Sequence, residues 1–289
     1  MPQSFGGAWT EEKLQALEDY LNAYLNIFTS HTVASRFTRH YVDAFAGSGL
    51  REVRPAADKQ TRLDFEEADQ YLRGSVHRVL GLRESFHRYH FVERDKTNAD
   101  ELRHSIATEF PERARSCVVV ETDANAYLVE WAAKLTWTDR AVVFLDPFGM
   151  AVRWDTIKAL AQTKKVDLWL LFPSSSVIRM LPKRGPTDEA WSRKLTDFFG
   201  TDSWNDHFFP ASPQGDLFGA ESRKRDVSQR TVAEYILQRL GEVFHGVVDE
   251  PLVLYNSRNS PLFMLLFAAA NPKGAPTGVR IARHIIQRK

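Results

Sequence analysis

Four short apolar segments of this chain end in an acidic residue, and this pattern restricts the possible folds more than any other feature. Stretches of helical spacing separate the four segments, which is typical of an α/β fold with a mostly parallel sheet. Ligands of such folds bind at the carboxyl ends of the strands. We therefore expect the four acids to meet at one edge of the sheet. They are Asp43, Glu93, Asp123 and Asp146.

The alternation of apolar and amphipathic segments predicts a single domain over residues 1–289. An opening helix runs to Phe28, and a central sheet of seven strands follows, with the last strand antiparallel to the others. A cap or substrate region interrupts the pattern at 177–228. The predicted strands are 40–45, 88–93, 116–123, 141–149, 166–172, 251–256 and 262–270. The predicted helices after the first are 74–82, 98–110, 124–135, 154–161, 189–199 and 232–244.

The composition is that of a globular protein. Of 289 residues, 43% are hydrophobic, and 38 Lys and Arg balance 37 Asp and Glu. This excludes disorder as the dominant state and argues against sequence-blind polyanion binding over the whole surface. The lone Cys117 cannot form an internal disulfide, and no apolar run approaches the roughly 20 residues that cross a bilayer. Without a readable secretory signal, a cytoplasmic location is expected.

The first acid precedes a glycine turn whose sequence argues against a dinucleotide and against a nucleoside triphosphate as the ligand. Gly47 and Gly49 permit a tight turn and a close approach of a ligand to the backbone. The third glycine of the dinucleotide fingerprint is missing, and so is the Gly-Lys-Ser/Thr of a phosphate-binding loop. The remaining candidate carries little negative charge and offers hydrogen-bond donors and cations to carboxylates. S-adenosylmethionine fits that description.

Several blocks carry a resemblance to known proteins. The acids, the 43–49 turn and Asp146-Pro147-Phe148-Gly149 resemble the ordered motifs of Rossmann-like class I S-adenosylmethionine-dependent methyltransferases. More narrowly, three stretches resemble the three-Cys-motif partner protein family (TcmP): the opening helix running into 41–47, the block 144–149 and the closing stretch 255–274. In that family the three-cysteine motif belongs to the partner protein, so a single cysteine here is compatible with membership.

The resemblance implies a role for each position. Asp43 and the glycine turn would line the methionine end of the cofactor, Glu93 would hold the ribose hydroxyls and Asp123 the adenine amine. A backbone N–H of Ala124 or Asn125 would face the adenine ring. The residues assigned to the cofactor are Asp43, Ala44, Gly47, Gly49, Glu93, Asp123 and Ala124.

The Asp146-Pro147-Phe148-Gly149 block resembles that of enzymes that methylate exocyclic amines of nucleic-acid bases. The Asp146 carboxylate and the Pro147 carbonyl would steer the lone pair of the amine, so that alignment supplies most of the rate gain. Phe148 would stack on a flat substrate ring. These three are the catalytic candidates. The second proline of the Asp-Pro-Pro-Tyr pattern is absent here, which leaves the target atom open.

Structural alternatives exist for several of these residues. Asp123 fits the N-cap of a helix equally well, and Phe148 fits the core equally well. The nine histidines lack the spacing of a metal site and are interpreted as structural or surface residues, so no metal is expected. The run Ser174–Ser176 lacks the context of a nucleophile and is interpreted as a polar turn.

Two classes of partner remain open, a nucleic acid and a cysteine-rich protein. A basic rim that would face a phosphate backbone is expected from Arg179, Lys183, Arg184, Arg223, Lys224 and Arg225, together with the carboxyl-terminal Arg280, Arg283, Arg288 and Lys289. The alternatives to base methylation are a non-catalytic role as partner of a cysteine-rich protein and methyl transfer to a protein or peptide. No membrane partner is expected.

Overall fold

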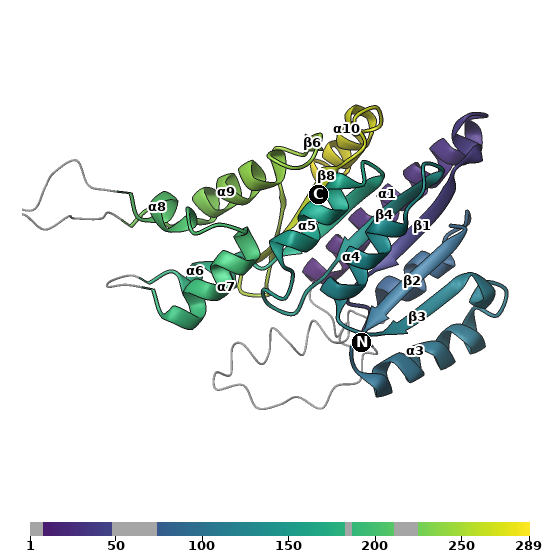
Figure 1. Ribbon diagram of the computed structural model, residues 1–289, viewed down its shortest axis with the longest axis horizontal. Coiled ribbons are helices and arrows are strands. Elements are labelled where there is room, and N and C mark those ends of the chain that lie inside the picture. The colour runs from purple at the N-terminus through teal and green to yellow at the C-terminus, as the bar shows by residue number, and fades with distance from the viewer. Residues whose placement is uncertain (1–7, 48–73, 183–186, 211–224) are drawn as a thin grey trace, which may run out of the picture.

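The computed structural model describes residues 8–47, 74–182, 187–210 and 225–289. Within these ranges the strands form one eight-stranded sheet in the order β3-β2-β1-β4-β5-β8-β6, with β7 also paired to β8. Figure 1 shows the sheet and the helices around it. The strands are β1 (Thr38–Asp43), β2 (Arg88–Glu93), β3 (Cys117–Glu121), β4 (Asp139–Leu145), β5 (Val166–Phe172), β6 (Gly246–Val247), β7 (Leu252–Tyr255) and β8 (Pro261–Ala269).

The predicted fold class is confirmed. β1, β2, β3, β4 and β5 are parallel, and β8 is antiparallel to each of its neighbours β5, β6 and β7. The strand order reverses between β1 and β4, because β2 lies on one side of β1 and β4 on the other. The sheet has one strand more than predicted. That strand is β6, whose two residues are too short to show a hydrophobic alternation.

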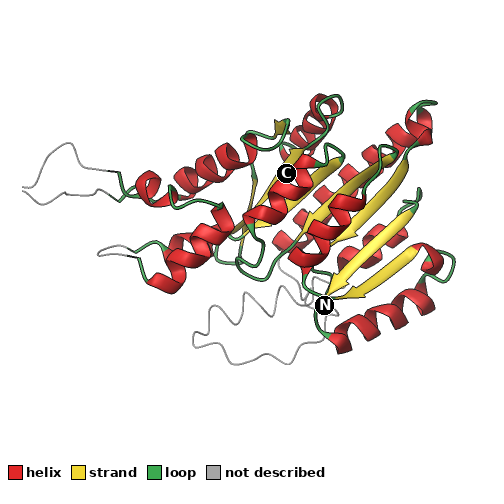
Figure 2. Ribbon diagram, viewed as in Figure 1, coloured by secondary structure: helices red, strands yellow, loops and turns green. Residues whose placement is uncertain are grey.

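Helices cover both faces of the sheet (Figure 2). α1, α3, α10 and the helical residues 74–81 share a hydrophobic core with one face. α4, α5, α6, α7, α8 and α9 contribute to the core of the other face. The bounds are α1 (Ala8–Ser30), α3 (Lys96–Glu109), α4 (Ala124–Lys134), α5 (Trp154–Gln162), α6 (Ser174–Met180), α7 (Glu189–Phe199), α8 (Trp204–Phe208), α9 (Gln229–Gly241) and α10 (Ala275–Ile286).

Three helices, α6, α8 and α10, were not expected from the sequence. Ser174–Ser176, predicted as a polar turn, form the first turn of α6, and the Ser174 hydroxyl donates to the Leu262 carbonyl at 3.3 Å. α10 follows the last strand and buries Ala282, Ile285 and Ile286 against the α1 side of the core. Its apolar spacing is helical, so the sequence did contain a signal for it.

The described parts of the predicted cap region belong to the main core. α7 and α8 bury Leu195, Phe198, Phe199, Trp204 and Phe208 in the hydrophobic cluster that also contains residues of α5 and α9. The role of 177–228 as a substrate region stays a prediction.

A buried acid on β5 connects the sheet to α1. The Tyr20 hydroxyl donates to Asp167 Oδ2 at 2.7 Å. Burial raises the pKa of Asp167 to about 6, although the Tyr20 hydrogen bond and the nearby Arg140 act in the opposite direction. Because the folded state binds this proton more tightly than the unfolded chain, ionised Asp167 costs stability as the pH rises from about 4 through about 6.

Asp167→Asn is therefore expected to stabilise the protein at pH 8 by about 1–3 kcal/mol, because the amide oxygen still accepts from Tyr20 and no charge is buried. Urea unfolding of both proteins at pH 8 and near pH 4 measures this difference, which should shrink at the lower pH. A variant that is less stable than the wild type at pH 8 would contradict this account of Asp167.

Candidate functional site

Three of the four predicted acids lie on the same face of the sheet. The register pairs Asp43 with Phe91 on β2 and with Phe144 on β4. Glu93 and Asp146 each follow their phenylalanine by two positions, and side chains two apart along a strand share a face. The core beneath these acids is the one that α1 covers. All three side chains are at most 9% exposed.

Asp43 is fully buried at the end of β1. Its carboxylate accepts a hydrogen bond from the Ser75 hydroxyl at 2.9 Å and one from the Phe45 amide at 3.3 Å. Burial raises the pKa of Asp43 to about 7, and the negative charge of Asp146 acts in the same direction. The two hydrogen bonds and Lys13 act against it. Asp43 therefore titrates near neutral pH.

Asp146 forms an ion pair with a lysine that lies inside the protein. Lys13 Nζ on α1 donates to Asp146 Oδ2 at 2.9 Å, and the lysine side chain is 0% exposed. Burial lowers the pKa of Lys13 to about 8, while Asp146 and Asp43 oppose that shift. Among the described residues Oδ1 of Asp146 has no partner. This oxygen is thus available to a substrate donor.

Glu93 and the glycine turn flank Asp43. Glu93 Oε1 accepts from the Asp95 amide at 2.7 Å, which holds the carboxylate at the end of β2. The Ala46 amide donates to the Val92 carbonyl, and Gly47 follows with a φ of +56°, a conformation that favours glycine. Gly49 lies outside the described residues. The Ala44 amide donates to the Phe144 carbonyl, so that amide is committed to the sheet.

Asp123 differs from the three buried acids in its exposure to solvent. It is the N-cap of α4, accepts from the Ala126 amide at 3.1 Å, and its side chain is 49% exposed. The N-cap alternative is confirmed, and a contact with the adenine amine stays a prediction. Ala124 is the first residue of α4, where amides lack an acceptor within the helix.

The segment after β4 makes a turn next to the site. Pro147 is buried, and Phe148 is half-buried and packs against the α1 side of the core. Gly149 has a φ of +61°, and no atom lies within 4 Å of where its Cβ would be, so conformation rather than space favours glycine there. The packing of Phe148 fits the core interpretation, and its predicted stacking on a substrate is not tested.

Sequence reasoning missed Lys13 and Ser75. Lys13 lies between Trp9 and Leu17 on the buried side of α1, four residues from each, and its Nζ is 5.2 Å from the centroid of the Trp9 ring. A lysine at a core position of an amphipathic helix was the available signal. Ser75 is a small polar residue in a helix, and it carries no comparable signal.

The predicted basic rim is only partly within the described residues. Lys183, Arg184, Arg223 and Lys224 lie outside them. Arg179 is exposed and donates to the Ser176 hydroxyl at 3.1 Å. Arg225 donates to the carbonyls of Pro182 at 3.0 Å and Val227 at 3.4 Å, so its guanidinium is partly used within the protein.

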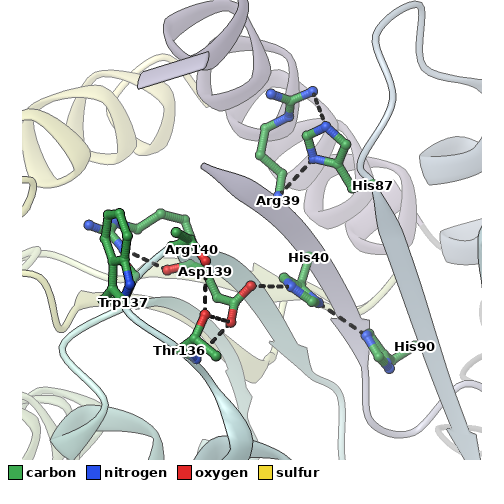
Figure 3. A network of polar contacts seen from close by, with 9 residues as sticks. Arg39, His40, His87, His90, Thr136, Trp137, Asp139 and Arg140 are labelled. Carbon is green, nitrogen blue, oxygen red and sulfur yellow. Dashed lines mark hydrogen bonds and ion pairs between the residues drawn. The ribbon is translucent and has the colours of Figure 1, made fainter. Parts of the chain in front are cut away.

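A second polar network lies at the opposite edge of the sheet, where β1 and β4 begin (Figure 3). His40 contacts His90 at 3.2 Å and Asp139 at 3.1 Å, and His90 contacts the Tyr127 hydroxyl at 2.8 Å. Burial lowers the pKa of His90 to about 4, and His40 and Arg88 add to that shift. His90 is therefore neutral at pH 7. No cluster of three or more potential metal ligands occurs within the described ranges.

The strand order and the antiparallel β8 beside β5 define an open, doubly wound α/β sheet whose order reverses between β1 and β4. No family model matches the sequence, and no curated protein matches it. In the part of the chain that the structure covers, no helix is long and apolar enough to cross a membrane.

Several solved structures resemble the chain at low identity. A Legionella pneumophila protein described by the family DUF519 is 13% identical, with a TM-score of 0.44 over 98% of this chain and 92% of that one. The methyltransferase domain of bacterial CtHen1 is 11% identical, with a TM-score of 0.37 over 88% and 98%. A protein from Listeria monocytogenes titled as an S-adenosylmethionine-dependent methyltransferase is 10% identical, with a TM-score of 0.36 over 81% and 91%.

Proposed function

We propose that this protein is an S-adenosylmethionine-dependent methyltransferase that acts on an amino nitrogen of a nucleic-acid base. The observation that carries the proposal is the cluster of Asp43, Glu93 and Asp146 on one face of the sheet, at the carboxyl ends of β1, β2 and β4. The cluster lies beside the position where the strand order reverses, which is the usual ligand site of an open α/β sheet.

The donor set suits a cationic nucleoside. Asp43 and Glu93 are buried carboxylates, one at the end of β1 and one at the end of β2, the neighbouring strand. Carboxylates accept from ammonium groups and from ribose hydroxyls, and the first-turn amide of Ala124 suits an acceptor atom of a ring. When bound, S-adenosylmethionine would supply an electrophilic methyl group on a sulfonium.

The chain's own residues would position the substrate amine. Asp146 Oδ2 is held by Lys13, so Oδ1 can accept an N–H of the amine together with the Pro147 carbonyl. This pair of acceptors would direct the nitrogen lone pair toward the methyl carbon. The proton that the nitrogen loses as its new N–C bond forms would leave through Oδ1. Most of the rate gain would come from this alignment.

Cofactor binding is expected to depend on the ionisation of Asp43. The pKa near 7 means that the carboxylate, which would attract the cofactor's cation, forms as the pH rises through neutrality. Affinity for S-adenosylmethionine should rise about tenfold between pH 6 and pH 8, because only the ionised fraction binds well. Isothermal titration calorimetry over this range measures the change.

Asp43→Asn is the matched control. The variant should bind S-adenosylmethionine at least about tenfold more weakly at pH 8. Its affinity should also lose the pH dependence that Asp43 contributes, so that only the titration of the ligand itself remains. An equal pH dependence in both proteins would remove Asp43 from the cofactor site. If neither S-adenosylmethionine nor its demethylated product raises the melting temperature of the wild type, the methyltransferase proposal itself fails.

The resemblance to the three-Cys-motif partner family suggests a second role, as partner of a cysteine-rich protein. Co-purification from the native host with and without added cofactor separates the two roles. An obligate complex without measurable cofactor affinity would favour the partner role.

A further inference from the structure

A groove of about 870 Å³ lies between α1 and α10, on the outer side of the helical layer that covers the candidate site. From α1 it is lined by Asp19, Asn22 and Ala23. From α10 and the residues after it, the lining consists of Arg280, Ile281, His284, Ile285, Arg288 and Lys289. The groove thus has an apolar floor and a strongly basic side.

The two helices run antiparallel, and this places one end of the groove near the candidate site. Early in α10, a Cβ at Gly278 would lie 3.3 Å from the Tyr20 hydroxyl. At the other end, Lys289 lies close enough to Glu12 to lower its pKa, which burial raises. Glu12 directly precedes Lys13, the lysine that contacts Asp146. The carboxyl-terminal end of the basic side therefore lies toward the first turns of α1, which carry Lys13, while the α1 residues that line the groove are Asp19, Asn22 and Ala23.

The basic side chains of the groove form a regular row. Arg280 and His284 are one turn apart on the same face of α10, about 6 Å along the helix, and Arg288 follows four positions later, just after the helix ends. All three and Lys289 are exposed. No ion pair joins Arg280, Arg288 or Lys289 to another residue in the described ranges, and Asp19 is the acid among the lining residues. By contrast, Arg283 does not line the groove, and its guanidinium forms an ion pair with Asp249 at 3.0 Å.

We propose that this groove binds the phosphate backbone of a single-stranded nucleic acid and leads it to the candidate site. Arginine suits this role because its planar guanidinium donates two parallel hydrogen bonds to a phosphate. The row of charges matches a ligand with a repeating anion, and the near-neutral charge of the whole chain makes the local excess distinctive. A single strand is favoured because a base must leave its stack to reach an enclosed acid such as Asp146.

This inference rests on the proposed function, but its test needs neither cofactor nor turnover. The probe is a fluorescently labelled 20-nucleotide single strand, made both as RNA and as DNA, and binding is followed by anisotropy from 50 to 200 mM salt. With three phosphate contacts the affinity of the wild type should fall about 20-fold over this range. Arg280→Gln/Arg288→Gln should leave about one contact, bind more weakly at 50 mM, and lose only about threefold.

The control variant Arg230→Gln/Arg283→Gln removes the same charge from sites outside the groove. Arg230 pairs with Glu234 on α9 and Arg283 with Asp249. This variant should keep the wild-type salt dependence. All three proteins should melt at the same temperature, because the substituted side chains lie at the surface.

Three results would overturn the proposal. The first is an equal loss of affinity in both double variants, because binding would then depend on overall charge and not on the groove. The second is a wild type that binds neither strand at 50 mM salt. The third is a dimer in sedimentation that only the groove variant abolishes, since a second copy would then occupy the groove. Cofactor titration is measured separately, so failure here and failure of the methyltransferase proposal are distinguishable.

Discussion

Lys13→Met is expected to lower the free energy of unfolding by about 3–5 kcal/mol. The substitution removes the ammonium partner of Asp146 and leaves that nearly buried carboxylate unpaired. Lys13 is 0% exposed and its Nζ lies 2.9 Å from Asp146 Oδ2. Methionine fills a similar volume, so loss of packing contributes little. Urea unfolding at pH 7 measures the change.

The double variant Lys13→Met/Asp146→Asn separates charge from packing. Removing both members of a buried ion pair is often nearly neutral, so most of the lost stability should return and the coupling energy should be about 2 kcal/mol or more. Lys158→Met, which breaks an exposed pair with Asp155, is the matched control and should cost less than about 1 kcal/mol. Additive effects of the two buried substitutions would show that the pair does not act as a unit.

The second large effect is expected on catalysis. Asp146→Asn should lower kcat about 100-fold or more on an oligonucleotide that the wild type methylates, because an amide at this position can donate to the substrate amine and misalign its lone pair. Affinity for S-adenosylmethionine should change less than about threefold, since Asp43 and Glu93 remain. Transfer of a radiolabelled methyl group to single-stranded oligonucleotides measures kcat, and calorimetry measures cofactor affinity.

Glu130→Gln is the control for this second prediction. Glu130 is an exposed acid on α4 that pairs with Lys134 at 3.8 Å, and it belongs to neither the cofactor nor the substrate site. Its kcat should stay within about threefold of the wild type. Full activity in Asp146→Asn would remove the amine-steering role while leaving the cofactor site intact.

Strong local sequence patterns were sufficient to predict most strands of the sheet. β2 and β5 begin and end where the sequence predicts, because each is an apolar run bounded by polar residues. α7 also has its predicted bounds, with Asp188 as N-cap and Gly200 ending the helix at a φ of +72°. β6 and α6 were missed because a two-residue strand and a serine-rich first turn have weak local preferences. Tertiary packing decides both.

The residues of the candidate site were likewise predictable only in part from the sequence. Asp43, Glu93 and Asp146 could be predicted because each follows an apolar strand, and parallel strands end at one edge. Asp123 has the same sequence context, yet it remains half exposed as an N-cap, since β3 is an edge strand of the sheet. The place of its strand in the sheet, which the local sequence does not encode, leaves Asp123 exposed while the other three acids are buried.

The amino-acid sequence alone determined the fold class, the strands that carry the acids and the absence of a phosphate-binding loop, because these depend on periodicity and on residue types a few positions apart. Only the tertiary structure decided that Lys13 meets Asp146 across 133 positions, that Ser75 meets Asp43, and that α1 and α10 form a basic groove. The physical reason is that burial and charge pairing act between residues brought together by packing. The pKa of Asp43 and the partner of Asp146 therefore follow from the folded chain as a whole.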